Sequence, residues 1–304
     1  MRALVIGGAG FIGSNLVDGL IKDGHEVEVW DNLSTGLRNN VNPLANFINC
    51  DITRNYDARK VLMNEFKPDV VFHLAALARV QPSIEDPIPY HNVNVNGMLN
   101  VLNLCVECGV KRFVFSSSSS VYGDVEQLPT TEEAPLNPMS PYALHKNIGE
   151  EYCKLYSKLY GIETVSLRYF NVYGERQPTE GAYCLVMGVF AQQLLNGELM
   201  TINGDGEQRR DFTYVGDVVD ANIKCATIKM KLVGDIFNIG AGDNRSVNQT
   251  ANLLGGDSSR IHRDPVVEPK ETLAHNGKAR FLLNWKPTQN FEEWVIKWKE
   301  GLGL

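Results

Sequence analysis

The sequence predicts an α/β protein with a doubly wound parallel sheet, and three observations support this fold class. Short apolar runs alternate with helical patterns through the first half of the chain, which predicts parallel strands joined by right-handed helical crossovers. The apolar run 112–115 has the pattern of a buried strand. A glycine-rich turn follows the first run, as in a Rossmann sheet.

We expect a smaller C-terminal substrate-binding subdomain beside this sheet, because the strand–helix alternation ends near residue 174. Residues 1–174 are predicted to form the Rossmann domain, together with a return segment of about residues 211–240. Residues 175–304 are predicted to form the smaller subdomain, with an irregular tail before a final helix at 291–300. A chain of 304 residues, 43% of them hydrophobic, is long enough for two unequal lobes.

The composition argues against several classes of partner. The net charge is −7 and no basic run occurs, so nucleic acid and anionic membranes are not expected as partners. No apolar segment approaches the roughly 18 residues of a membrane span, and the N-terminus does not resemble a signal peptide. Cys105 and Cys108 have a metal-like spacing but no second pair nearby, so no metal site is expected. We predict a cytoplasmic protein.

The first strand, residues 3–6, leads into a glycine motif. Gly8, Gly10 and Gly13 satisfy G-x-G-x-x-G, and a helix and a second strand ending at Asp31 follow. This order predicts a dinucleotide site, in which the backbone approaches a pyrophosphate at a helix N-terminus and the acid binds a ribose. Asp31 would repel a 2′-phosphate, which favours NAD over NADP, although Arg38 lies nearby in sequence.

Later strand ends supply further candidate contacts with a dinucleotide. The strand 46–50 leads to Asp51 and Ile52, which are placed for an adenine contact. The strand 69–74 leads to the small residues Ala75 and Ala76, which would let the backbone lie against a cofactor or simply pack. A long helix is expected over 89–108. Its Asn94 should point toward the sheet, where a structural hydrogen bond and a cofactor contact both remain open.

The stretch from Ser116 to Lys146 carries the candidate chemistry. A serine run, Ser116–Ser120, follows the buried strand 112–115 and so lies at the edge of the sheet where ligands bind. A helix is predicted to begin after Ser140, which places Tyr142 and Lys146 four residues apart on one helical face. A hydroxyl, a phenol and a cation that meet at this edge would form a proton-transfer site.

Nine motifs together resemble the extended short-chain dehydrogenase/reductases, and specifically UDP-sugar 4-epimerases of the UDP-glucose and UDP-N-acetylglucosamine kind. The motifs are Gly7–Gly13, Asp31, Asp51–Ile52, His73–Ala76, Asn94, Ser116–Gly123, Tyr142–Lys146, Arg168–Gly174 and Ile202–Tyr214. The resemblance implies NAD as the cofactor, a UDP-sugar as the substrate and a homodimer built from the helices 89–108 and 142–160.

The same resemblance implies a role for each matching residue. Tyr142 would be the catalytic base, and Ser118 would bind the sugar 4-hydroxyl. Lys146 and the cationic nicotinamide would together lower the pKa of Tyr142, and Lys146 would also hold the nicotinamide ribose. The implied cofactor-binding residues are Gly7, Gly10, Phe11, Ile12, Gly13, Asp31, Asn32, Asp51, Ile52, Leu74, Ala75, Ala76, Asn94, Ser116, Tyr142, Lys146 and Tyr169. The implied substrate-binding residues are Ser118, Tyr142, Asn171, Val186, Thr201, Asn203, Arg210 and Thr272.

Two features near the C-terminus bear on the substrate. The family commonly has an arginine as a second diphosphate ligand where this chain has Pro265, so recognition of uracil is left open; Arg263 could substitute. Thr272 lies where a small residue admits an N-acetyl group in the resembling enzymes, and the run Gly181–Tyr183 and the turn 202–207 are similar to that branch. The expected substrates are UDP-GlcNAc and UDP-GalNAc, with UDP-Glc and UDP-Gal accepted as well.

The same residues bear on other functions within the resembling enzymes. The nucleotide-sugar 4,6-dehydratases need carboxylates after the catalytic hydroxyl, and the related decarboxylases need one; here those positions are Ser119 and Ser120. A UDP-uronate 4-epimerase stays open because Arg79 or Gln81 could face a carboxylate. A catalytically silent dinucleotide-binding regulator is disfavoured, since Ser118, Tyr142 and Lys146 are all present.

Overall fold

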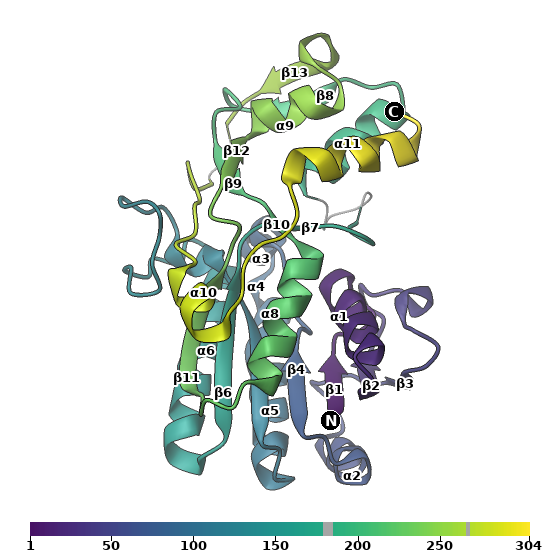
Figure 1. Ribbon diagram of the computed structural model, residues 1–304, viewed down its shortest axis with the longest axis vertical. Coiled ribbons are helices and arrows are strands. Elements are labelled where there is room, and N and C mark those ends of the chain that lie inside the picture. The colour runs from purple at the N-terminus through teal and green to yellow at the C-terminus, as the bar shows by residue number, and fades with distance from the viewer. Residues whose placement is uncertain (179–184, 266–267) are drawn as a thin grey trace.

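The computed structural model describes residues 1–178, 185–265 and 268–304, and its centre is a seven-stranded parallel sheet (Figure 1). The strands stand in the order β11-β6-β5-β4-β1-β2-β3. The chain starts at β1 and adds β2 and β3 on one side, and then adds β4 and the later strands on the other side, so the strand order reverses between β1 and β4. Ligands bind in parallel sheets at such a reversal. The strands are β1 (Arg2–Ile6), β2 (Glu26–Asp31), β3 (Asn46–Asn49), β4 (Val70–His73), β5 (Arg112–Ser118), β6 (Glu163–Tyr169) and β11 (Val233–Ile239).

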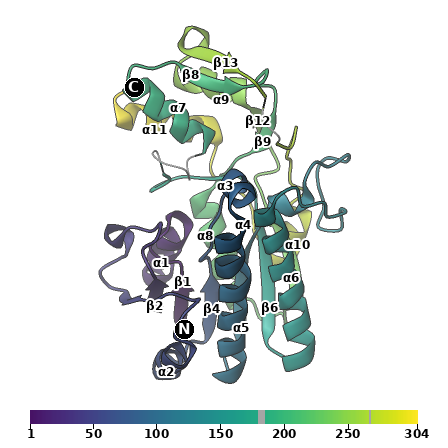
Figure 2. The same ribbon diagram turned by 180° about the vertical axis from the view of Figure 1, so that it is seen from behind.

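Helices cover both faces of the sheet, which confirms the predicted fold class. Helices α1 (Phe11–Lys22) and α8 (Val215–Thr227) cover one face, whereas α2 (Tyr56–Phe66), α5 (Met98–Glu107) and α6 (Pro141–Tyr160) cover the other (Figure 2). Successive residues of each strand point to opposite faces. In β1, Ala3 and Val5 belong to the first core, and Leu4 and Ile6 belong to the second. This double burial explains why β1 is apolar without alternation.

The helix expected over 89–108 is present as one continuous helical stretch, but a π turn lies within it. The structure has α3 (Val80–Glu85) and α4 (Pro87–His91), then a π-helical turn, η2 (Asn92–Gly97), and then α5. Because the extra residue in a π turn leaves no distinct composition, the sequence pattern gave no sign of it. The turn lies beside the ligand edge, where it buries Asn94.

A second lobe lies beyond the carboxyl ends of the strands (Figure 1). It has its own apolar core, in which Phe190, Ile202, Leu254 and Trp294 take part. Short ladders, β7 (Val172–Tyr173) with β10 (Thr213–Tyr214) and β9 (Arg209–Asp211) with β12 (Asn244–Ser246), lie between this core and the sheet. The main elements of the lobe are α7 (Val186–Leu195), β8 (Met200–Asn203), α9 (Val247–Leu254), β13 (Arg260–Arg263) and α11 (Phe291–Leu302).

One part of the predicted smaller subdomain packs elsewhere. Helix α10 (Gly277–Leu283), in a tail that was expected to be irregular, returns to the sheet. Leu283 and Trp285 are buried in the core of the sheet lobe, and Trp285 Nε1 donates a 2.8 Å hydrogen bond to the carbonyl of Asp217 in α8. The boundary at residue 174 stays a prediction. In the part of the chain that the structure describes, no helix is both long and apolar enough to cross a bilayer.

Candidate active site

A cavity of about 710 Å³ opens at the carboxyl ends of the strands, where the strand order reverses. All of the cofactor-binding residues predicted from the sequence line this cavity except Asn94. The side-chain amide of Asn94 instead clamps the backbone of Leu77, accepting from its N–H at 2.8 Å and donating to its carbonyl at 2.9 Å. Asn94 thus supports the cavity wall, and the structural alternative describes it better than a cofactor contact.

The glycine loop is shaped for close approach of a ligand to the backbone. A Cβ on Gly13 would lie 2.1 Å from the carbonyl oxygen of Gly7, and one on Gly7, whose φ is +84°, would lie 2.6 Å from the backbone nitrogen of Ala75. Helix α1 begins after Gly10 and has no side-chain cap. Its first N–H groups are therefore free to bind an anion, as a dinucleotide pyrophosphate requires.

Asp31 joins this loop to the end of β2. Its carboxylate accepts hydrogen bonds from the backbone N–H groups of Ala9, at 3.0 Å, and Leu33, at 2.8 Å. Arg38 does not line the cavity, because its guanidinium lies 4.5 Å from the centre of the Phe47 ring. The carboxylate of Asp31 would repel a 2′-phosphate, so the residues fit NAD.

The candidate catalytic residues come together at the start of α6. Ser140 caps this helix by accepting from Ala143 N–H at 3.2 Å. One turn further, Lys146 Nζ donates to the carbonyl of Ser116 at 2.6 Å and lies 5.9 Å from the centre of the Tyr142 ring. The phenol of Tyr142 is hydrogen-bonded to the hydroxyl of Ser118. The structure thus brings Ser118, Tyr142 and Lys146 into one cluster, as the sequence predicted.

Burial has opposite effects on the two titratable groups of this cluster. It raises the pKa of Tyr142 above its usual value of 10, and the hydrogen bond from Ser118 opposes this. It lowers the pKa of Lys146 to about 8, and the negative charge of Glu150 opposes this. Because burial has the largest effect on the pKa of Tyr142, the lowering expected from Lys146 together with the cationic nicotinamide stays a prediction. Lys146 still supplies a cation beside the phenol.

Several residues that line the cavity were missed by the sequence reasoning. The clearest is Arg176, which lies just beyond the Arg168–Gly174 motif and has a φ of +65°. Its guanidinium donates to Asp18 of α1 at 2.6 Å, so it reaches the cavity from the chain that leads into the second lobe. No local spacing signals this contact. The missed lining residues are Ile6, Ala9, Trp30, Ser34, Thr35, Leu37, Asn40, Cys50, Leu77, Ala78, Val93, Ser117, Arg176, Gln177 and Pro178.

The predicted substrate-binding residues occupy two places. Asn171 and Thr272 meet, since Asn171 Nδ2 donates to Thr272 Oγ1 at 3.4 Å, and Arg210 lies on the adjoining strand β9. Val186, Thr201 and Asn203 lie in the second lobe, at the start of α7 and in β8. The hydroxyl of Thr201 is occupied by Gln193 Nε2 at 2.8 Å. Of the substrate-binding set, Tyr142 lines the cavity of 710 Å³.

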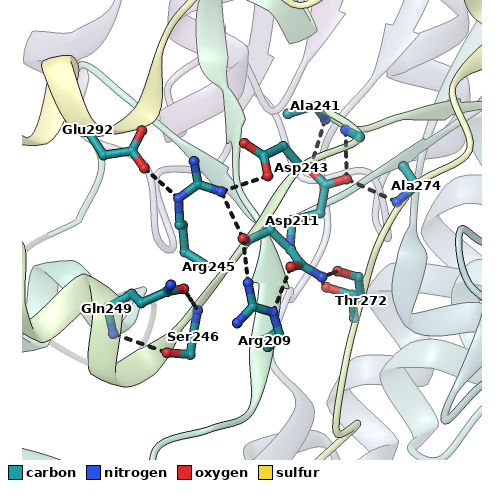
Figure 3. Close-up of polar contacts among 12 residues, drawn as sticks. Arg209, Asp211, Ala241, Asp243, Arg245, Ser246, Gln249, Thr272, Ala274 and Glu292 are labelled. Carbon is teal, nitrogen blue, oxygen red and sulfur yellow. Dashed lines mark hydrogen bonds and ion pairs between the residues drawn. The ribbon is translucent and has the colours of Figure 1, made fainter.

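Asp211 connects the segments that carry these residues (Figure 3). Its buried carboxylate accepts from the N–H groups of Ala241, at 2.8 Å, and of Gly242 and Ala274, both at 3.0 Å. Burial raises the pKa of this carboxyl to about 6, and the three backbone donors oppose the shift. The backbone N–H of Asp211 also donates to Thr272 Oγ1 at 3.2 Å. The hydroxyl of Thr272 is therefore held next to β9 by the backbone of Asp211 and by the side chain of Asn171.

The region in which the chain departs from the resembling family is partly described. The guanidinium of Arg210 is paired with the carboxylate of Glu268 and also donates to the carbonyl of Arg209 at 2.9 Å. Arg263 pairs with Asn203 in the ladder between β13 and β8. The run Gly181–Tyr183, which favoured the N-acetylated branch, lies outside the described residues.

Known proteins resemble this chain over most of its length. The model of the NAD dependent epimerase/dehydratase family matches residues 3–240. The chain belongs to this family. A putative UDP-glucose 4-epimerase from Methanocaldococcus jannaschii is 41% identical over 306 residues, which cover 98% of each chain. The resemblance inferred from the nine motifs is thereby confirmed, with NAD as the cofactor.

Solved structures of family members match over nearly the whole chain. UDP-glucose 4-epimerase from Thermotoga maritima, determined with UDP-glucose, has a TM-score of 0.93 and 37% identity, covering 99% of this chain and 98% of that one. UDP-N-acetylglucosamine 4-epimerase from Methanobrevibacter ruminantium, in complex with UDP-N-acetylmuramic acid, has a TM-score of 0.90 and 34% identity, covering 98% and 97%. The epimerase family's fold therefore extends through both lobes.

His73 should make the stability of this family member sensitive to acid. The ring lies buried at the end of β4, and its Nδ1 has no hydrogen-bond partner among the described residues. Burial, and then the charge of Lys146, lower its pKa from 6.5 to about 3. Below pH 6.5 the unfolded chain therefore binds a proton that the folded chain refuses, so the folded state loses stability as the pH falls toward 3.

We predict the size of this loss from the variant His73→Phe. Between about pH 7.5 and about pH 5, the free energy of unfolding of the wild type should fall by about 2 kcal/mol more than that of the variant. Urea denaturation at the two pH values measures both falls. Equal falls would show that His73 is not held neutral in the folded protein.

Proposed function

We propose that the protein catalyses NAD-dependent 4-epimerisation of a UDP-sugar. The observation that carries the proposal is the cluster of Ser118, Tyr142 and Lys146 at the edge of a cavity that fits NAD. No carboxylate stands in the two positions after Ser118. The cluster is suited to transferring one proton while a hydride is transferred, and it has no carboxylate there for dehydration or decarboxylation.

The chain's own residues account for the proton. Bound NAD supplies a hydride acceptor that is restored at the end of each turnover. Tyr142 takes the proton of the sugar 4-hydroxyl, and Ser118 holds that hydroxyl through a hydrogen bond. The cation of Lys146 stabilises the phenolate that results, at a site where burial alone disfavours it. Tyr142 later returns the proton to the 4-oxygen of the epimer.

The turn after Ser118 supports epimerisation over dehydration or decarboxylation. Ser119 and Ser120 lie in the 3₁₀ turn η3 (Ser119–Tyr122). The hydroxyl of Ser120 is buried and has no hydrogen-bond partner in the part of the chain that the structure describes. An unpartnered hydroxyl cannot replace the carboxylate that protonates a leaving 6-hydroxyl or removes a proton at C5. A 4-keto intermediate formed here is therefore expected to be reduced again rather than to lose a group.

The preferred sugar is inferred from Thr272. Its hydroxyl is bound to the backbone of Asp211 and to Asn171, so its short side chain is held in one place. A small residue there supports UDP-GlcNAc and UDP-GalNAc as substrates, with UDP-Glc and UDP-Gal accepted as well. Arg210 and Asn171 are proposed to bind the diphosphate, since a guanidinium fork matches phosphate oxygens. A UDP-uronate stays an alternative that a substrate panel would reveal.

The variant Tyr142→Phe tests the proposed base. It removes one hydroxyl and should leave NAD bound, while kcat for interconversion of 4-epimers falls by at least about a thousandfold, as expected for loss of a general base. The measurement resolves 4-epimers after incubation with UDP-Glc, UDP-GlcNAc and UDP-glucuronic acid. Near-normal turnover by Tyr142→Phe would remove Tyr142 from the mechanism, and a wild type inactive on the whole panel would overturn the proposed function.

The variant Thr272→Tyr tests the proposed sugar preference. A bulky ring at this position should lower kcat/KM for UDP-GlcNAc at least about tenfold more than for UDP-Glc, because the N-acetyl group needs the space. Thr272→Ser, which keeps the hydroxyl that bonds to Asp211 and Asn171, is the matched control and should change the ratio little. An equal loss on both sugars would show that Thr272 does not select the 2-substituent.

A cytoplasmic location stays a prediction.

We also propose that the protein forms a homodimer. Leu144, Leu155 and Leu159 recur on one stripe of α6 and are 47%, 46% and 62% exposed, an apolar face suited to a second copy. Leu159→Glu should therefore convert the protein from dimer to monomer in sedimentation at micromolar concentration. Ile296→Glu, a similarly exposed position in α11, is the control. A wild type that sediments as a monomer would exclude the dimer.

A further inference from the structure

A buried ion pair lies beneath the candidate active site. Arg168 donates to both carboxylate oxygens of Glu150, through Nε at 2.9 Å and a terminal nitrogen at 2.7 Å. The two side chains are 2% and 0% exposed. Burying two charges gains little stability over apolar residues of the same size, because both lose their hydration. Stability alone therefore does not explain why the pair stands here.

Glu150 is connected to the serine run through β5. It lies one helical turn after Lys146 in α6, and both side chains reach the same strand. Lys146 donates to the carbonyl of Ser116, and the hydroxyl of Ser117 donates to Glu150. Ser118, the partner of Tyr142, is the next residue. Ser116 and Ser117 of β5 are thus hydrogen-bonded to α6, immediately before Ser118.

The surroundings leave Glu150 little freedom to move. Arg168 lies directly opposite Ser117 in the register of β5 and β6, and its guanidinium lies 4.6 Å from the centre of the Tyr122 ring. Gly149 allows α6 to approach β5 closely, since a Cβ there would lie 2.4 Å from Phe115. Glu150 is therefore held from a second strand and by the contact between helix and sheet.

We propose that Glu150, held by Arg168, positions the serine end of β5 through Ser117 and so sets the place of Ser118 relative to Tyr142. Glu150, Arg168 and Ser117 are positioning residues in this proposal, which rests on the proposed function because it takes Ser118 and Tyr142 as the reacting groups. The negative charge of Glu150 also acts on the neighbouring cation, because it favours the protonated form of Lys146.

Ser117→Ala is the decisive variant. Glu150→Gln would leave the buried guanidinium of Arg168 without a counter-charge and could prevent folding. Ser117→Ala removes one hydrogen bond and leaves every charge in place. Ser166→Ala is the matched control: Ser166 lies in β6, is 1% exposed against 3% for Ser117, and its hydroxyl bonds to no charged group in the described structure.

We expect Ser117→Ala to lower kcat about tenfold, with KM for the UDP-sugar, NAD content and the midpoint of the kcat–pH profile unchanged. Ser166→Ala should keep its kcat within about twofold. A kcat for Ser117→Ala within twofold of wild type, an equal loss in both variants, or a loss confined to KM would each overturn the proposal. Such a result leaves the proposed function intact as long as Tyr142→Phe is inactive.

A second measurement does not depend on turnover. Crystal structures of Ser117→Ala and Ser166→Ala should show Ser118 displaced from Tyr142 in the first variant and unmoved in the second. An unmoved Ser118 in Ser117→Ala would overturn the positioning role even if the protein proved to act on none of the sugars tested.

Discussion

The contact between α6 and β5 is the constraint on which the rest of the site depends. The helix carries the phenol and the ammonium, the strand carries the serines, and neither set is useful unless the two elements keep one register. Three contacts within about one turn of the helix fix that register: Gly149 packs against Phe115, Lys146 donates to the carbonyl of Ser116, and the hydroxyl of Ser117 donates to Glu150.

The second constraint is the position of the lobe beyond the sheet. The buried carboxylate of Asp211 accepts hydrogen bonds from the turn at Ala241 and Gly242 and from Ala274, in the segment that carries Thr272. One carboxylate therefore links parts of the chain that are distant in sequence. Arg245 adds to this region by pairing with Asp243 and with Glu292 of α11 (Figure 3). The proposed sugar-selecting residue is therefore held by the same contacts that place the lobe.

Features that depend on short spacings could be predicted from the sequence. The glycine loop, Asp31 at the end of a strand and the four-residue step from Tyr142 to Lys146 are set by local backbone geometry, and the structure places them together. Arg176 and the partners of Asp211 depend on which remote segments meet, so no spacing reveals them. The π turn at Asn92–Gly97 and the return of α10 to the sheet were missed for a related reason, since their sequences resemble an ordinary helix and a loop.

The return of α10 bears on how the two lobes can move and evolve. The chain leaves the sheet after β6, comes back for α8 and β11, leaves again to build α9, and comes back once more for α10 before ending in α11. The second lobe is consequently connected to the sheet lobe by several segments of the chain and not by a single linker. Any movement of one lobe against the other would have to be accommodated at all of those crossings together. For the same reason neither lobe can be cut out of the gene as a single continuous piece.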